Sequence, residues 1–244
     1  MPFLIGFMVN YPLMTERVEE NPLSAEVKRH LRGVVRPILA DDPRFGAAHG
    51  TSLEVVRHLI THGTIPGRMV PEIHFLPGDI SVYPTAKLNV NHLIDLTPKD
   101  EQVNLREDTR MYARGIGRTH RFLTLLGIPL SNMDNNDLSN ARDFLSVPDE
   151  DELGQPVARG YFIQKGFSPD LVDSAFNEAD AIEACGFLLG ISPEIQNTPG
   201  LSIVKGDKQI GDVTIRTFGK GLPYKYITGI EALGEAEKAF LANL

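Results

Sequence analysis

A dense group of chemically capable residues lies near residue 50. His49, Gly50, Thr51 and Ser52 follow one another there, after a short apolar run. A glycine lets a ligand approach the backbone closely, and the imidazole and two hydroxyls supply hydrogen-bond donors and acceptors beside it. A helix beginning at this point adds N–H groups that favour an anion such as a pyrophosphate. These residues predict a binding site; the alternative is an ordinary strand-to-helix junction with an internally bonded His49.

Other patterns that could carry chemistry are weak. His58 and His62 stand four apart in HLITH, but the HExxH zinc pattern needs a glutamate directly after the first histidine. The DNNDLS run lacks the glycine and the terminal glutamate of a calcium loop, which indicates a surface turn. The sequence contains no P-loop, no GxGxxG and no GxSxG. We therefore expect no metal site, and neither a nucleotide kinase, a Rossmann enzyme nor an ordinary α/β-hydrolase.

The residues around the candidate site predict the elements that position it. Residues 45–48 form a short apolar run, which predicts a strand that leads into the site. A helix should follow, because Thr51 and Glu54 make a capping-box pattern and apolar residues recur at helical spacing between 53 and 60. Gly63 is expected to end this helix.

The rest of the chain predicts a single α+β domain over residues 1–244. Residues 1–44 form an N-terminal extension with a helix over 24–39, and residues 100–150 form a helical insertion that contains a turn-rich NMDNNDLSN break. Residues 155–244 contain short β-rich runs separated by Gly, Pro and Asn, and end in a helix. We therefore expect a predominantly antiparallel sheet towards the C-terminus.

Composition and charge exclude several classes of protein. The chain has 244 residues, of which 42% are hydrophobic and 23% charged, enough for a buried core. Its net charge of −8 argues against broad nucleic-acid binding, which depends on Lys and Arg at phosphates. No apolar run approaches the roughly 18 residues of a membrane helix, and the N-terminal run lacks signal-peptide features. Cys185 is the only cysteine, and we expect it to lie in the core. Since the chain can form no internal disulfide, we predict a reducing, cytoplasmic location, and the lack of a membrane helix predicts no membrane contact.

The order His49-Gly50-Thr51-Ser52, then a helix, then His62-Gly63 resembles the opening of the ADP-ribosyltransferase fold, in its poly(ADP-ribose) polymerase and diphtheria-toxin branch. This resemblance implies that His49 binds the nicotinamide ribose of NAD. It also implies that the Gly50 backbone holds the nicotinamide amide, with Thr51 and Ser52 beside it.

The next element of that fold is an aromatic-containing strand, followed by a tyrosine that stacks on nicotinamide. IHFLPGDISVYPTAKL is similar to it, and offers Tyr83 as the stacking residue. This chain departs from the family in two places. His74-Phe75 stands where the family usually has Tyr-Phe, and Pro84 directly follows Tyr83.

The C-terminal third resembles the same fold. GFLLGISPEI is similar to a central strand of a split sheet, and GDVTIRTFGKGLPYKYITGIEAL to its final strand pair. The family's catalytic glutamate begins the first of these strands, and the matching position here is Asp212. An aspartate can orient a ribose hydroxyl and stabilise an oxocarbenium-like centre, although its side chain is one methylene shorter. Glu231, the nearest glutamate, is expected to face away.

The resemblance covers residues 45–95 and 183–233. It implies a split, mostly antiparallel sheet with an inserted helical segment, and an NAD-dependent ADP-ribosyltransferase, a glycosyltransferase that uses NAD as a substrate. Nicotinamide would leave through an oxocarbenium-like ribosyl centre near Asp212 and His49, and an acceptor would attack. The acceptor is expected to be a protein rather than a nucleic acid, recognised by residues 100–150; an effector or toxin role is open.

Two alternatives remain at this stage. RNA 2′-phosphotransferases share the fold and have an HxHL strand where this chain has EIHFL, which makes Arg44, Arg57, Arg68 and His74 candidate phosphate-binding residues. The N-terminal Arg-His signature of that family is not found here. The second alternative is a non-catalytic binding module on a degenerate site, suggested by the aspartate in place of glutamate. Binding of 2′-phosphorylated RNA would favour the phosphotransferase. Failure to bind or consume NAD would favour the non-catalytic binding module.

Overall fold

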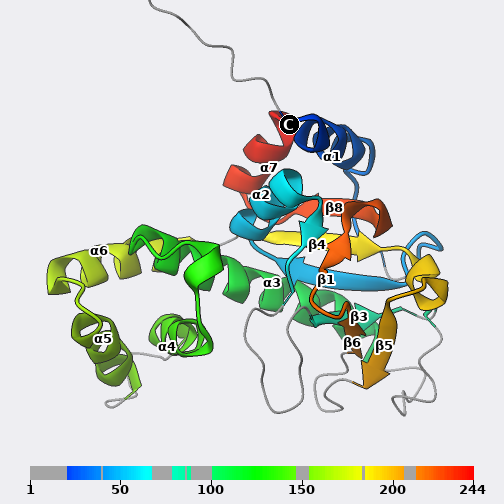
Figure 1. Cartoon of the computed structure of the whole chain (residues 1–244). Coiled ribbons are helices and arrows are strands. Elements are labelled where there is room, and N and C mark those ends of the chain that lie inside the picture. Colours follow the sequence, from blue (N-terminus) through cyan, green and yellow to red (C-terminus); the bar gives the residue numbers. More distant parts are fainter. Residues whose placement is uncertain are drawn as a thin grey trace, which may run out of the picture.

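The chain forms a six-stranded antiparallel sheet with helices on both faces (Figure 1). The computed structural model describes residues 21–39, 41–67, 79–85, 87–88, 101–146, 154–182, 185–205 and 213–244. The strands lie in the order β5-β6-β3-β1-β4-β8. Their bounds are β1 Ala47–Thr51, β3 Ile80–Pro84, β4 Phe187–Ile191, β5 Ser202–Lys205, β6 Val213–Arg216 and β8 Ile227–Ala232. A second sheet pairs β2 Thr64–Ile65 with β7 Leu222–Pro223.

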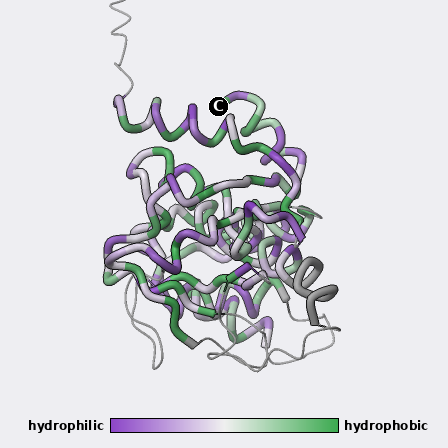
Figure 2. The backbone as a smooth tube through the Cα atoms, turned by 90° about the vertical axis from the view of Figure 1, so that its right-hand side faces the viewer, coloured by the Kyte–Doolittle hydropathy of each residue, from purple (hydrophilic) through white to green (hydrophobic). Residues whose placement is uncertain are grey.

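One face of the large sheet forms the main hydrophobic core with three helices. These helices are α1 Pro22–Gly33, α2 Leu53–His62 and α7 Glu235–Ala242. Leu31, Leu59 and Leu241 of these helices belong to one buried cluster with Phe187 and Leu189 of β4. Strand β4 is buried along its whole length between β1 and β8. Figure 2 shows the alternation of hydrophilic and hydrophobic turns along α1 that this one-sided packing requires.

The start of α2 differs by one residue from the sequence prediction. Ser52, rather than Thr51, caps the helix, and its Oγ accepts a hydrogen bond from the backbone N–H of Val55 at 3.3 Å. Thr51 is still part of β1, because it pairs with Phe187 of β4. Gly63 ends the helix in the left-handed conformation, with φ of 74°, as predicted.

Four helices between the strands form a separate helical segment with its own core. They are α3 Glu101–Leu125, α4 Asn135–Ser146, α5 Gly154–Gln164 and α6 Pro169–Asp180. Phe122 of α3 and Phe162 of α5 are fully buried in this core. The helical segment extends beyond the 100–150 expected from the sequence, and the predicted turn-rich break begins α4. The β-rich character expected from residue 155 starts only at β4, since residues 154–180 pack as helices on α3 and α4.

Helix α3 joins the two parts, because its first half lies on the sheet and its second half lies in the helical segment (Figure 1). A Cβ on Gly50 of β1 would lie 2.8 Å from the Cβ of Ala113, and one on Gly117 would lie 2.8 Å from Cys185 Sγ. Gly186 has a φ of 88°, and a Cβ there would lie 2.6 Å from the carbonyl oxygen of Ala113. Small residues therefore set how closely α3 approaches the sheet.

The structure confirms the predicted α+β class with a mostly antiparallel sheet. The C-terminal helix and the buried Cys185 are also as predicted. Burial raises the pKa of the Cys185 thiol to about 11, so this cysteine is a packed core thiol rather than a nucleophile.

The central strands leave no room for a side chain at Gly190. A Cβ there would lie 2.4 Å from Cδ1 of Phe45, which is fully buried. We expect Gly190→Ala to lower the free energy of unfolding by about 1–3 kcal/mol, the usual cost of overpacking. Gly160→Ala in α5, with no atom within 4 Å of the new Cβ, is the matched control. It should raise stability by up to about 1 kcal/mol. Urea unfolding measures both, and a Gly190→Ala variant as stable as the wild type would contradict the packing described.

Candidate functional site

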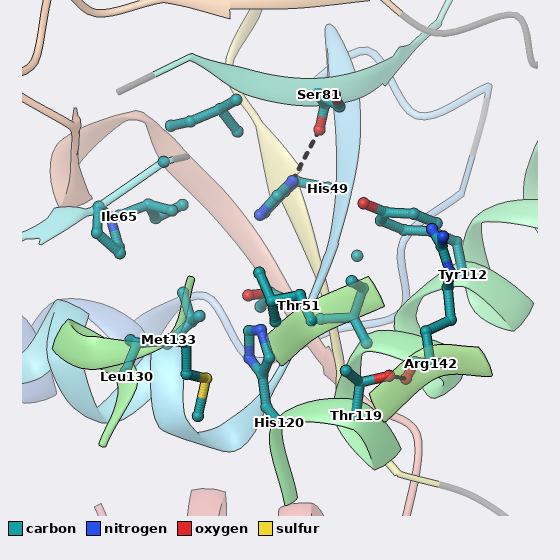
Figure 3. Close-up of a pocket in the computed structure, with 18 of the residues that line it drawn as sticks. His49, Thr51, Ile65, Ser81, Tyr112, Thr119, His120, Leu130, Met133 and Arg142 are labelled. Carbon is teal, nitrogen blue, oxygen red and sulfur yellow. Dashed lines mark hydrogen bonds between the residues drawn. The ribbon is translucent and has the colours of Figure 1, made fainter. Parts of the chain in front are cut away.

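A cavity of about 810 Å³ lies between the sheet and the helical segment. One wall, the sheet wall, includes His49, Gly50 and Thr51 of β1 and Asp79 and Ser81 at the start of β3. The opposite wall, the helical wall, comes from α3 and α4 and includes Tyr112, Thr119, His120, Asn135, Ser139 and Arg142. Figure 3 shows His49 above the open space, with His120 and Thr119 below it and Tyr112 at one side. Segments far apart in the sequence thus meet around one cavity, whose lining is mostly apolar and carries a few polar side chains.

His49 is held in one orientation by the neighbouring strand. Its Nδ1 lies 2.9 Å from the backbone carbonyl oxygen of Ser81 (Figure 3). A carbonyl can only accept, so Nδ1 carries the proton and donates it. Burial lowers the pKa of His49, which keeps the ring neutral. Its Nε2 is therefore a bare acceptor on the cavity side.

Gly50 lines the cavity, but its missing side chain has a packing role as well. The space that a Cβ would occupy is filled by Ala113 of α3. A glycine at this position predicts the close approach of a ligand to the backbone. The structure gives a second reason, which is close approach of a helix.

Thr51 and Ser52 have different surroundings although they are neighbours. Thr51 lines the cavity, as expected for a binding residue. Ser52 does not line it and is fully buried. Its Oγ caps α2 and lies 2.7 Å from Nδ1 of His120. Ser52 can therefore act on a ligand only through His120.

Tyr112, rather than Tyr83, is the tyrosine that lines the cavity. Tyr83 is 7% exposed on β3, opposite Ala48 of β1. Its ring meets the edge of Tyr112 at a centroid distance of 6.2 Å. Tyr83 is not among the described residues that line the cavity, and the stacking role expected of it stays a prediction. Tyr112 reaches from α3 toward His49 (Figure 3), and no local sequence pattern singled it out.

Three acidic residues bear on the chemistry proposed for the site. Asp212 lies outside the described residues. Asp79 lines the cavity with a fully buried side chain, and its carboxylate pairs with Arg216 of β6 at 3.2 Å. Glu231 does not line the cavity; it binds Arg110 of α3 at 2.7 Å and accepts the N–H of Ile38 at 2.8 Å. Sequence reasoning missed Asp79 because its ionic partner is distant in the chain.

His120 was also missed, although it lines the cavity from α3. The residue is 8% exposed, and burial lowers its pKa from 6.5 to about 4. The ring is therefore neutral near pH 7. A histidine one turn from the apolar end of a helix gives no local signal, because its partner Ser52 stands 68 residues earlier.

Of the four basic residues proposed for phosphate transfer, the two that the structure describes, Arg44 and Arg57, do not line the cavity. Arg44 pairs with Asp42 through its Nε at 2.8 Å, and the Arg57 guanidinium lies over the Phe240 ring at 5.9 Å. Arg68 and His74 lie outside the described residues. Within the described chain, the arginine that lines the cavity is Arg142 of α4.

Acid should destabilise the protein through His120. Its folded-state pKa is about 4, against 6.5 without burial, so the unfolded chain binds more protons between these values. The associated stability is complete above pH 6.5 and is lost as the pH falls toward 4, by up to about 3 kcal/mol. Urea unfolding from pH 7.5 to 4 measures this loss. The free energy of unfolding of His120→Phe should fall less steeply as the pH is lowered. Part of the fall should remain, because burial also lowers the pKa values of His49 and His58. The same pH dependence of unfolding in the wild type and in His120→Phe would contradict the lowered pKa of His120.

Comparisons with protein-family models, with curated proteins and with solved structures find no match to this chain. Within the described part of the chain, none of the helices is long and apolar enough to cross a membrane. A functional conclusion must therefore rest on the sequence motif and on the geometry of the cavity.

Proposed function

We propose that the cavity binds NAD and that the chain is an NAD-dependent ADP-ribosyltransferase on a split-sheet fold, with a protein as acceptor. The observation that carries this proposal is the orientation of His49. Its Nδ1–H is bound to the Ser81 carbonyl at 2.9 Å, and the residue lines the cavity. The bare Nε2 can accept a hydrogen bond from a ribose hydroxyl, which is the role that the HGTS resemblance implies.

The size and lining of the cavity support this ligand. Its volume of about 810 Å³ lies within the range of about 300–1,000 Å³ that is common for small-molecule and cofactor sites. Gly50 can present its backbone to the nicotinamide amide. Tyr112, which is 38% exposed, takes the stacking role in place of Tyr83. An aromatic face beside a flat heterocycle is a favourable arrangement.

The reaction breaks the bond between the nicotinamide nitrogen and the ribosyl carbon. The bonding electron pair leaves with nicotinamide, and positive charge develops on the ribosyl ring. An acceptor then supplies an electron pair to that carbon and loses its proton. A carboxylate near the ribose lowers the energy of this charged centre.

Asp212 remains the acid we propose for this step. It directly precedes Val213, the first residue of β6, which pairs with Val82 of β3. Val82 is next to Ser81, whose carbonyl holds His49. Asp79 is an acid that lines the cavity in the described part of the chain, but its ion pair with Arg216 gives it a structural role.

Calorimetric titration with NAD tests the binding step. His49→Ala removes the acceptor for the ribose hydroxyl, so we expect NAD binding to weaken about tenfold, the effect of one hydrogen bond. His62→Ala is the control, because His62 lies exposed at the end of α2. Full NAD affinity in His49→Ala would remove the proposed anchor, and no NAD binding by the wild type would overturn the proposed function.

Release of nicotinamide tests the acid. Asp212→Asn should bind NAD with little change but release nicotinamide about 100-fold more slowly, a typical loss for one electrostatic group. Asp79→Asn should instead lower stability, because it leaves Arg216 without its anion. If Asp79→Asn remains folded and loses turnover while Asp212→Asn does not, Asp79 is the acid. NAD binding without release by the wild type, with acceptor protein present, would indicate a binding module.

A further inference from the structure

A buried serine–histidine pair reaches the cavity and has no part in the proposed reaction. Ser52 stands at the start of α2 and His120 in α3, and Ser52 Oγ lies 2.7 Å from His120 Nδ1. Ser52 is 0% exposed and His120 is 8% exposed. Such a pair in the interior fixes both side chains, because each polar group needs its partner there.

The hydrogen bonds of Ser52 determine which nitrogen of His120 carries the proton. Ser52 Oγ already accepts the N–H of Val55 at 3.3 Å. If His120 Nδ1–H also donated to Oγ, the hydroxyl proton would be buried with no acceptor among the residues that the structure describes, which is costly. The arrangement that satisfies every group has Ser52 O–H donating to a bare Nδ1. A neutral His120 then carries its proton on Nε2.

Nε2 is the nitrogen of His120 that a ligand in the cavity can reach, because Nδ1 is bound to Ser52, which does not line the cavity. His120 lines the cavity, and Figure 3 shows it across the open space from His49. Within the described residues, the hydrogen bond of the His120 ring is the one at Nδ1. An N–H donor in the wall of an open cavity is a group that a ligand can satisfy.

We propose that His120 is a ligand-binding residue whose Nε2–H donates a hydrogen bond to an unprotonated oxygen of the ligand, a carboxamide carbonyl or a phosphate oxygen. Ser52 is the positioning residue that fixes this donor. Since NAD contains both kinds of oxygen, this assignment rests on the proposed function. His49 and His120 then offer opposite groups, an acceptor for a hydroxyl on one wall and a donor to an oxygen on the other.

The protonated nitrogen can be measured without any ligand. Nitrogen-15 NMR of the imidazoles should show the proton of His120 on Nε2 in the wild type. Ser52→Ala should produce a mixture of the two tautomers. Ser168→Ala is the matched control, since Ser168 caps α6 through Leu171 in the same way but has no histidine partner. A wild-type proton on Nδ1 would overturn the assignment.

Titration of variants with NAD, nicotinamide and ADP-ribose tests the donor. His120→Phe keeps a ring but has no N–H, and should weaken NAD binding about tenfold. His120→Gln presents an amide N–H and should recover part of that loss, which a merely structural role would not produce. If His120→Phe binds nicotinamide more weakly than the wild type, the carboxamide carbonyl is the partner of His120. If it binds ADP-ribose more weakly, a phosphate oxygen is the partner.

The outcomes separate this inference from the proposed function. If the wild type binds NAD and His120→Phe binds it equally well, His120 is not a ligand-binding residue and the proposed function stands. If the wild type binds none of the three compounds, both proposals fail. Thermal unfolding of each variant confirms that it is folded before titration.

Discussion

The close contact between α3 and the sheet is the constraint on which the rest of the structure depends. A Cβ added at Gly50 would lie 2.8 Å from the Cβ of Ala113, and one added at Gly117 would lie 2.8 Å from the Sγ of Cys185. Close-packed interiors do not absorb such overlap without movement. The absence of these side chains lets a 25-residue helix lie directly on β1. Because the same helix continues into the helical segment, this contact sets the distance between the two walls of the cavity.

Two histidines, the half-buried His49 and the buried His120, give the cavity its hydrogen-bonding character. Each is kept neutral by burial and is oriented through Nδ1 by a group on another element. The partner of His49 is a carbonyl and that of His120 is a hydroxyl, so the two Nε2 atoms have opposite roles. Groups fixed in this way need little reorganisation when a ligand binds, which favours affinity and selectivity. Neither ring can change its role unless its partner moves.

Local sequence patterns predicted local structure well and tertiary relations poorly. The junction from β1 to α2 and the left-handed Gly63 follow from residues within a few positions of each other. The cap moved from Thr51 to Ser52 because Thr51 completes the pairing of β1 with β4, a contact that no neighbouring residue indicates. The same limit explains why the sequence pattern points to Tyr83 and gives no sign of Tyr112, which lines the cavity. Which tyrosine reaches the cavity depends on where α3 lies, and this depends on glycines in β1 and before β4.

The face that α3 turns to the cavity follows from the face that it turns to the sheet. Ala113 and Gly117, four residues apart, contact the sheet, and Tyr112, Ile116, Thr119 and His120 line the cavity. This second set has the i, i+4, i+7, i+8 spacing of one helical stripe. Each residue advances an α-helix by about 100°, so a shift of one position would carry His120 away from Ser52. The small residues that allow close packing therefore also fix the rotation of α3, and through it the donor that faces His49.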